Sequence, residues 1–162
     1  MTTTLDIKQE LVLKASRDKV WQALTTPEGW TGWFSEGVEG NFQVGEVLTL
    51  KFGEDTLCYG KVVEREENSS FAYKWHPGED CPMDKYPESE MTTVRFTLAD
   101  HPEGTLLTMV ESGFERIPEE RRANCVKMNT KGWAWELEEF QSFVEKGVRQ
   151  SKAGEDFSAS GS

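Results

Sequence analysis

Apolar and polar residues alternate along several short segments, which is the period-2 pattern of β-strands that bury one face. The first such segment carries Leu5, Ile7, Leu11 and Leu13, all at odd positions. Later apolar segments are separated by turn-forming residues, among them a turn at 44–46. We therefore predict further strands over these ranges: 38–42, 47–52, 57–66, 71–75, 94–98 and 105–112.

Two short helices are predicted directly after the first strand, because helix-start signals occur there twice in succession. Ser16 is a good N-cap for a helix with an apolar i, i+4 pair at Val20 and Leu24. Thr26 caps a second helix, and Pro27 suits its first position. The second helix is expected to present three aromatic residues along one side: Trp30, Trp33 and Phe34.

A long helix is predicted near the C-terminus, beginning at Pro118, since proline suits the first helical turn. Gly147 fits its C-cap. The residues that follow are polar, small and unpatterned, so we expect 148–162 to be a disordered polar tail. At about 100° per residue the helix carries one apolar stripe, formed by Val126, Trp133, Leu137, Phe140 and Val144, with Cys125 and Phe143 on its flank.

This order of elements predicts one α+β domain over residues 1–147. An antiparallel sheet can bury one face, and helices gathered on that face would complete a two-layer arrangement. The order is one strand, two short helices, six strands and a long helix.

A motif follows the first predicted strand and is carried by Ala15, Val20, Trp21, Ala23, Leu24, Thr25, Pro27, Glu28, Trp33 and Phe34. Further matching positions along the chain are Gly60, Trp75, Gly104, Thr105, Gly132 and Trp133. In these residues the chain resembles the START-like (SRPBCC) superfamily, and within it the homologues of the heat-shock-protein ATPase activator (AHSA-like proteins). The resemblance implies the helix-grip fold, in which a curved antiparallel sheet wraps around the C-terminal helix and leaves a cavity.

Composition narrows the classes of partner. The net charge of −11 repels phosphate backbones and anionic lipids, so we expect neither nucleic acid nor membrane as a partner of this acidic protein. The N-terminus lacks a secretory signal pattern, which favours a cytoplasmic protein. The cysteines at 58, 81 and 125 lack CxxC spacing, so we expect no disulfide framework and no metal site. We also expect no cofactor.

Catalytic motifs are not found in the sequence, and we assign no catalytic residue. Glu111 is a candidate polar anchor if its strand parity, shared with Leu107 and Met109, faces the interior. With the opposite parity inward, Glu111 would be solvated. His76 is a second candidate anchor, at the root of a proline-rich loop that ends near residue 90 and is either a functional lid or a variable surface loop.

Aromatic residues make up 11% of the chain and are the main functional signal. Either they fill a core, or some of them line a pocket for a small hydrophobic molecule. We take binding of such a ligand, between the long helix and the sheet, as the leading hypothesis. The wall residues predicted for this pocket are Trp33, Phe34, Tyr73, Trp75, Met109, Phe114, Trp133, Leu137 and Phe140.

Met128 and Trp135 are predicted to form an interaction surface on the other side of the long helix, for a homodimer or a protein partner. A break at Gly132, or a covering loop, would remove that surface. Two other functions stay open beside ligand binding. One is a co-chaperone-like interaction domain, and the other is a cyclase-type or hydrolase-type enzyme that uses polar groups in the cavity, although we favour a role without catalysis.

Overall fold

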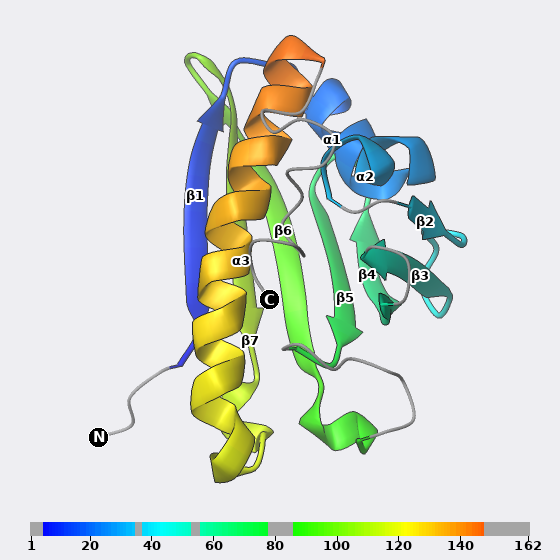
Figure 1. The fold of residues 1–162 in the computed structure, drawn as a ribbon. Helices are drawn as coiled ribbons and strands as arrows, with labels where there is room; N and C mark the ends of the chain where they lie inside the picture. Colours follow the sequence, from blue (N-terminus) through cyan, green and yellow to red (C-terminus); the bar gives the residue numbers. More distant parts are fainter. Residues whose placement is uncertain (1–4, 35–36, 53–55, 78–85, 148–162) are drawn as a thin grey trace.

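The computed structural model describes residues 5–34, 37–52, 56–77 and 86–147. A curved antiparallel sheet forms one layer, and the long helix α3 (Glu119–Lys146) lies along one face of it (Figure 1). The helices α1 (Arg17–Thr25) and α2 (Pro27–Trp33) cover the same face beside α3. This is the predicted α+β helix-grip fold.

The sheet of the described residues has seven strands in the order β1-β7-β6-β5-β4-β3-β2. The later strands therefore form a meander, and β1 pairs with β7 at one edge. Two short 3₁₀ turns, η1 (Glu88–Glu90) and η2 (Phe114–Arg116), flank the end of the sheet near the start of α3. The strands are β1 (Ile7–Leu13), β2 (Gly37–Glu39), β3 (Val47–Phe52), β4 (Thr56–Glu66), β5 (Ser70–Trp75), β6 (Thr92–His101) and β7 (Gly104–Ser112).

The predicted helix starts are confirmed by their hydrogen bonds. The Ser16 hydroxyl accepts from the backbone N–H of Lys19 at 3.2 Å. The Thr26 hydroxyl accepts from the N–H of Gly29 at 3.0 Å. A Cβ on Gly29 would lie 2.6 Å from the Cα of Ala23, so this glycine allows α1 and α2 to pack at close range.

The strand predicted over 38–42 is wrong in its second half. β2 ends at Glu39, because Gly40 has a φ of 131° that a strand cannot accommodate. A Cβ at Gly40 would also lie 2.9 Å from the carbonyl oxygen of Val47. Phe42 leaves the strand but stays in the core, where it is buried.

The long helix runs without interruption through Gly132, so the alternative in which it breaks there is excluded. Gly147 ends it as predicted, with a φ of 81° and its N–H bonded to the Phe143 carbonyl at 2.8 Å. Most of the predicted stripe is buried, whereas Val126 is half-buried. Gly32 of α2 gives room for the Phe143 ring, since a Cβ there would lie 2.3 Å from it.

The parity of β7 is settled by burial. Leu107, Met109 and Glu111 are 1%, 0% and 0% exposed, whereas Leu106 and Val110 are half-buried. Glu111 therefore points into the interior, which confirms the first of the two alternatives raised by the sequence.

The cysteines correct one prediction. Cys58 of β4 is disulfide-bonded, whereas the spacing of the cysteines led us to expect no disulfide framework. Cys81 lies outside the described residues, and Cys125 of α3 is a buried free thiol. A disulfide needs two cysteines that lie close together in the fold, and the spacing of cysteines along the sequence does not reveal this.

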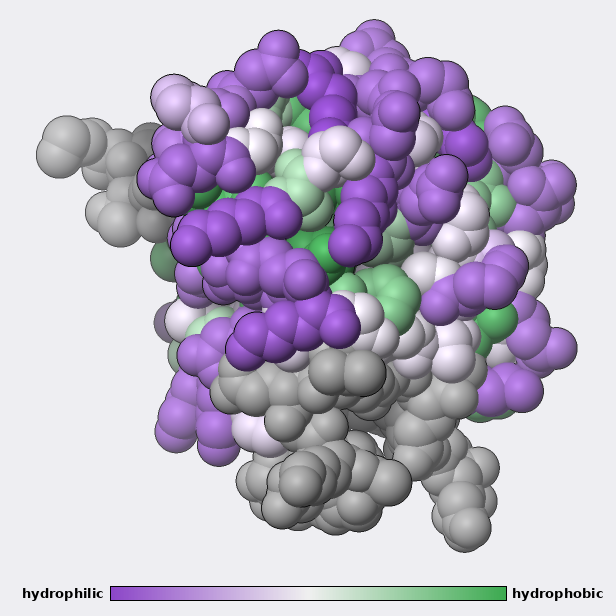
Figure 2. All heavy atoms as spheres, turned by 90° about the horizontal axis from the view of Figure 1, so that it is seen from above, coloured by the Kyte–Doolittle hydropathy of each residue, from purple (hydrophilic) through white to green (hydrophobic). Residues whose placement is uncertain are grey.

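The surface agrees with the acidic composition. Hydrophilic side chains dominate the end of the molecule that carries the β6–β7 turn and the last turn of α3 (Figure 2). Among the described residues, every helix is either too short or too polar to cross a lipid bilayer.

Candidate functional site

The centre of the interior is a polar cluster around Glu111. Its carboxylate accepts hydrogen bonds from the indole N–H groups of Trp75 at 2.9 Å and Trp133 at 2.8 Å. The Thr92 hydroxyl donates at 2.5 Å, and the Asn129 amide donates to both oxygens at 2.9 and 3.0 Å. Four side chains from β5, β6 and α3 thus converge on one carboxylate from β7.

Strand register and helix periodicity bring these groups together. Trp75 pairs with Thr92 across β5 and β6, at the end of the sheet where β7 carries Glu111. Asn129 and Trp133 are four residues apart on α3 and therefore share one face of the helix. Sequence reasoning singled out Glu111 and both tryptophans. It missed Thr92 and Asn129, although helix spacing from Trp133 could have identified Asn129.

Two opposing effects act on the Glu111 carboxyl. Burial raises its pKa above the ordinary value, and the hydrogen bonds from Thr92, Asn129 and the two indoles act in the opposite direction. Indole and amide N–H groups can only donate, so three of the four partners suit an ionised carboxylate, which can only accept. The donors therefore favour the ionised form of this carboxyl, whereas its burial favours the neutral form.

Tyr73 lies beside this cluster with a hydroxyl that is not satisfied. Its side chain is fully buried, and the hydroxyl has no hydrogen-bond partner among the described atoms. Burial raises its pKa well above the ordinary value, and the charges of Glu111 and Glu136 add to that shift. Gly60 of β4 makes room for the ring, because a Cβ there would lie 2.9 Å from Tyr73 Cδ2.

His76 is a second buried group without satisfied nitrogens. It is 1% exposed, and neither ring nitrogen meets hydrogen-bond geometry with a described atom. Burial lowers its pKa, with a smaller contribution from Arg121, and the Tyr86 backbone and Glu90 oppose the shift. The ring centroids of His76 and Tyr86 lie 5.6 Å apart. The Arg121 guanidinium lies over the Tyr86 ring, 3.7 Å from its centroid, and also forms an ion pair with Glu90.

All nine predicted wall residues are buried in one hydrophobic cluster. Trp33 contacts Phe140 with ring centroids 4.9 Å apart, and Tyr73 contacts Trp75 at 5.2 Å. Trp75 also lies 6.0 Å from Trp133, so the aromatic wall reaches the polar cluster. These side chains therefore share one interior, and their role as the walls of a ligand pocket stays a prediction.

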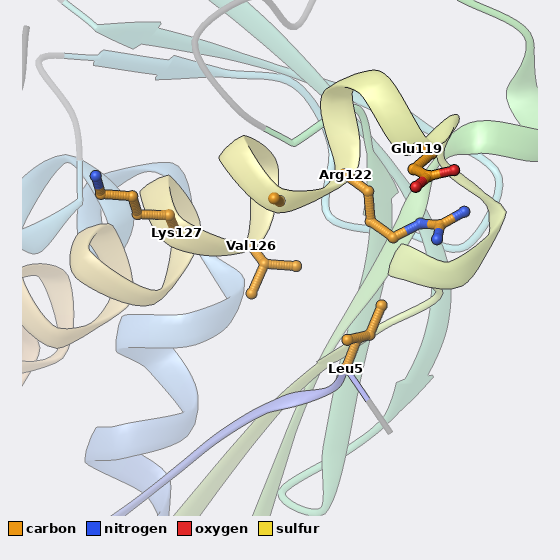
Figure 3. Close-up of a pocket in the computed structure, with 6 residues that line it drawn as sticks. Leu5, Glu119, Arg122, Val126 and Lys127 are labelled. Atoms are coloured by element: carbon orange, nitrogen blue, oxygen red, sulfur yellow. The ribbon is translucent and has the colours of Figure 1, made fainter. Parts of the chain in front are cut away.

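A hollow of about 460 Å³ opens on the surface between α3 and the beginning of β1 (Figure 3). Three apolar side chains and three charged ones surround it. None of the nine predicted wall residues lines it. The lining consists of Leu5, Glu119, Arg122, Ala123, Val126 and Lys127.

The proposed interaction residues lie elsewhere on α3. Met128 and Trp135 are both half-buried, and the Met128 sulfur accepts from the Asn124 amide at 3.5 Å. Seven residues separate them, so they lie on the same side of the helix two turns apart.

Comparison with known proteins identifies the family. The chain matches Activator of Hsp90 ATPase homolog 1-like proteins over residues 14–145. No functionally curated protein matches it.

Solved structures share the fold. The Aha1 dimer from Colwellia psychrerythraea, known in solution, is 24% identical, with 88% of this chain and 97% of that chain covered and a TM-score of 0.70. Protein MLL2253 from Mesorhizobium loti is 25% identical, covering 86% of this chain and 96% of that one, with a TM-score of 0.71. DynU16, from the dynemicin biosynthetic locus, is 18% identical, covering 93% and 51%, with a TM-score of 0.72.

The chain therefore belongs to the START-like superfamily and, within it, to the Activator of Hsp90 ATPase homolog 1-like family.

Proposed function

We propose that the domain binds a small, mostly apolar molecule between α3 and the sheet, with one polar group of the ligand at the Tyr73 hydroxyl. The observation that carries this proposal is the absence of a described partner for that fully buried hydroxyl. A buried hydroxyl without a hydrogen bond costs roughly 1–3 kcal/mol. A ligand that supplied the missing bond would recover much of that cost.

The hollow between β1 and α3 is the proposed entrance. Leu5 at its rim lies two residues before Ile7, which pairs directly with Glu111 across β1 and β7. Val126, on the other rim, lies one helical turn before Asn129 of the polar cluster. The hollow has a volume of about 460 Å³, which is within the usual range for small-molecule sites, roughly 300–1,000 Å³.

The polar cluster argues against the hydrolytic alternative. A general acid or base must exchange a proton with a substrate within hydrogen-bond reach. Both oxygens of Glu111 are already occupied by donors from the protein itself. This carboxylate is therefore better suited to holding the interior together than to chemistry.

Fluorescence titration with Prodan, a neutral naphthalene whose emission shifts to the blue in apolar surroundings, tests the proposal. We expect Tyr73→Phe to weaken binding about 2- to 10-fold, the range that corresponds to one net hydrogen bond. Val126→Trp should weaken it further by narrowing the hollow.

Val44→Trp is the matched control for the second variant, because Val44 lies in an exposed turn away from both sites. Circular dichroism checks that each variant is folded. Prodan affinity that is unchanged in both Tyr73→Phe and Val126→Trp would overturn the proposal. A loss confined to Val126→Trp would place the ligand in the surface hollow and overturn the role of Tyr73.

A homodimer is a second proposal, favoured by the Colwellia relative, which is described as a dimer. Met128 and Trp135, on one side of α3, are the proposed contact residues. Sedimentation equilibrium of the wild type and of Trp135→Ala tests it. A wild-type protein that stays monomeric at high concentration, or an unchanged dimer in the variant, would contradict this interface.

A further inference from the structure

We propose that the hollow between β1 and α3 receives an aliphatic carboxylate, an inference that rests on the proposed function and names the class of its ligand. The apolar chain of that ligand would lie toward the interior, and its carboxylate would stay at the surface beside Arg122. Two observations carry the inference. They are the mixture of apolar and charged side chains around the hollow and the hydrogen bonds that hold Arg122.

Apolar side chains line two sides of the hollow. Leu5, which precedes β1, faces Val126 of α3 across it, as Figure 3 shows. Ala123 lies three residues before Val126 and therefore on the same face of the helix. An alkyl chain between these side chains would be removed from water, which is the main driving force for binding an aliphatic molecule. The hollow is thus suited to the apolar part of an amphiphile.

The guanidinium of Arg122 is held in place by backbone carbonyls that precede α3. Its Nε donates to the Ile117 carbonyl at 3.0 Å, and its Nη2 donates to the Glu115 carbonyl at 3.2 Å. A guanidinium has five N–H donors, so three of them form no hydrogen bond to another described residue. Because Nε and Nη2 are bound along one edge, the edge formed by Nη1 and Nη2 remains for a planar carboxylate, which it can bind with two hydrogen bonds.

The charges around the hollow match those of one carboxylate. Arg122 and Lys127 are cations and Glu119 is an acid, so the lining has one net positive charge, although the whole chain carries −11. In Figure 3 the Lys127 ammonium lies at the opposite end from Arg122, which makes Arg122 the contact for the ligand head. One positive charge balances a carboxylate, whereas a phosphate monoester carries about −1.5 to −2 at pH 7. We therefore assign a carboxylate to this position.

Fluorescence titration of the full chain with dansylaminoundecanoate and with its primary amide tests the inference, because the two probes share an alkyl chain and differ in charge. The emission of the dansyl group shifts to the blue in apolar surroundings. We expect the carboxylate to bind about 3- to 10-fold more tightly at pH 7, since a hydrogen bond to a charged group is stronger than one to a neutral amide. The negative net charge of the whole protein acts against this preference, so a preference of this sign indicates a local cation.

Arg122→Gln should remove the preference, and the matched control Lys131→Gln, which changes an exposed cation of α3 outside the lining, should keep it. Circular dichroism checks the fold of each variant. Glu119→Gln leaves the described hydrogen bonds of Arg122 intact and should raise the preference about twofold. Glu120→Gln, at the exposed neighbour outside the lining, should leave the preference unchanged. This second pair decides the question if Arg122→Gln does not fold.

Failure of the wild type to bind either probe would contradict the proposed function. Equal binding of the two probes, or a preference that survives in a folded Arg122→Gln variant, would overturn only the assignment of the carboxylate. Equal effects of Glu119→Gln and Glu120→Gln would overturn that assignment as well, because the charge of the lining would then have no local role.

Discussion

The indole N–H groups of the buried tryptophans find their hydrogen-bond acceptors in different ways in the two halves of the aromatic interior. Under α1 and α2, the indole of Trp30 donates to the Leu24 carbonyl at 2.6 Å, and that of Trp33 donates to the Ala23 carbonyl at 2.8 Å. Both carbonyls belong to the last turn of α1, where backbone acceptors lack helical partners. The sequence separations are only 6 and 10 residues.

Under α3, the indoles of Trp75 and Trp133 instead share the carboxylate of Glu111, across separations of 36 and 22 residues. The first half is thus closed locally by its own backbone, and the second depends on tertiary assembly around a buried charge. The difference teaches that the α1–α2 half is stabilised locally by its own backbone, whereas the α3 half is stabilised by a buried polar cluster that borders Tyr73, the proposed ligand contact.

Removal of the central carboxylate should have the largest effect. Glu111→Leu leaves the donors of Trp75, Thr92, Asn129 and Trp133 without an acceptor in an apolar interior. We expect a loss of about 3–5 kcal/mol in the free energy of unfolding, measured by urea denaturation. Glu103→Leu, at an exposed turn, should change it by less than about 0.5 kcal/mol. A loss below about 1 kcal/mol for Glu111→Leu would show that the two halves do not differ.

A pair of smaller changes compares the halves directly. Trp75→Phe and Trp30→Phe both shorten a buried indole, but the first removes a donor to a charged group and the second a donor to a neutral carbonyl. Loss of the hydrogen bond should lower the free energy of unfolding by about 1.5–3 kcal/mol in Trp75→Phe and by about 0.5–1.5 kcal/mol in Trp30→Phe. Both variants should also lose a similar amount from packing. The loss for Trp75→Phe should shrink as the pH falls and Glu111 is protonated. Urea denaturation at two pH values measures both, and equal losses would contradict the comparison.

The same distinction explains what the sequence could predict. The caps at Ser16 and Thr26 and the aromatic face of α2 depend on neighbours a few residues away, and these predictions are confirmed. Glu111 could be placed only as one of two alternatives, because strand parity does not say which face is buried. The hydrogen bond of Thr92 to Glu111 depends on two strands meeting in the sheet, and it was not predicted. The Cys58 disulfide was not predicted either.

His76 gives a pH-dependent contrast with Glu111. Its pKa is lowered in the folded state, so below about pH 6.5 the unfolded chain binds a proton that the folded chain resists. Its contribution to stability is therefore complete above about pH 6.5 and is lost as the pH falls toward the folded pKa, by at most about 1.4 kcal/mol per pH unit.

Glu111 has the opposite sign. Its folded pKa is raised, so the folded state binds more protons than the unfolded state just above pH 4.5, and its contribution decreases as the pH rises through that window. His76→Phe should flatten the fall in stability between about pH 6.5 and about pH 5. Urea midpoints across this range measure the slope, and an unchanged slope in the variant would contradict the buried neutral ring.

Tyr73→Phe should have the smallest effect on the free energy of unfolding. It should also be the most diagnostic substitution, because the change in stability has the opposite sign to that of the other substitutions. Tyr73→Phe removes a buried hydroxyl without a described partner and leaves the ring in place beside Gly60. The ligand-free variant should be as stable as the wild type or up to about 1 kcal/mol more stable. Tyr59→Phe in β4 is the half-buried control. A loss of more than about 1 kcal/mol in urea denaturation would mean that the protein itself already satisfies the Tyr73 hydroxyl. In that case, the polar half would be as self-sufficient as the half beneath α1 and α2.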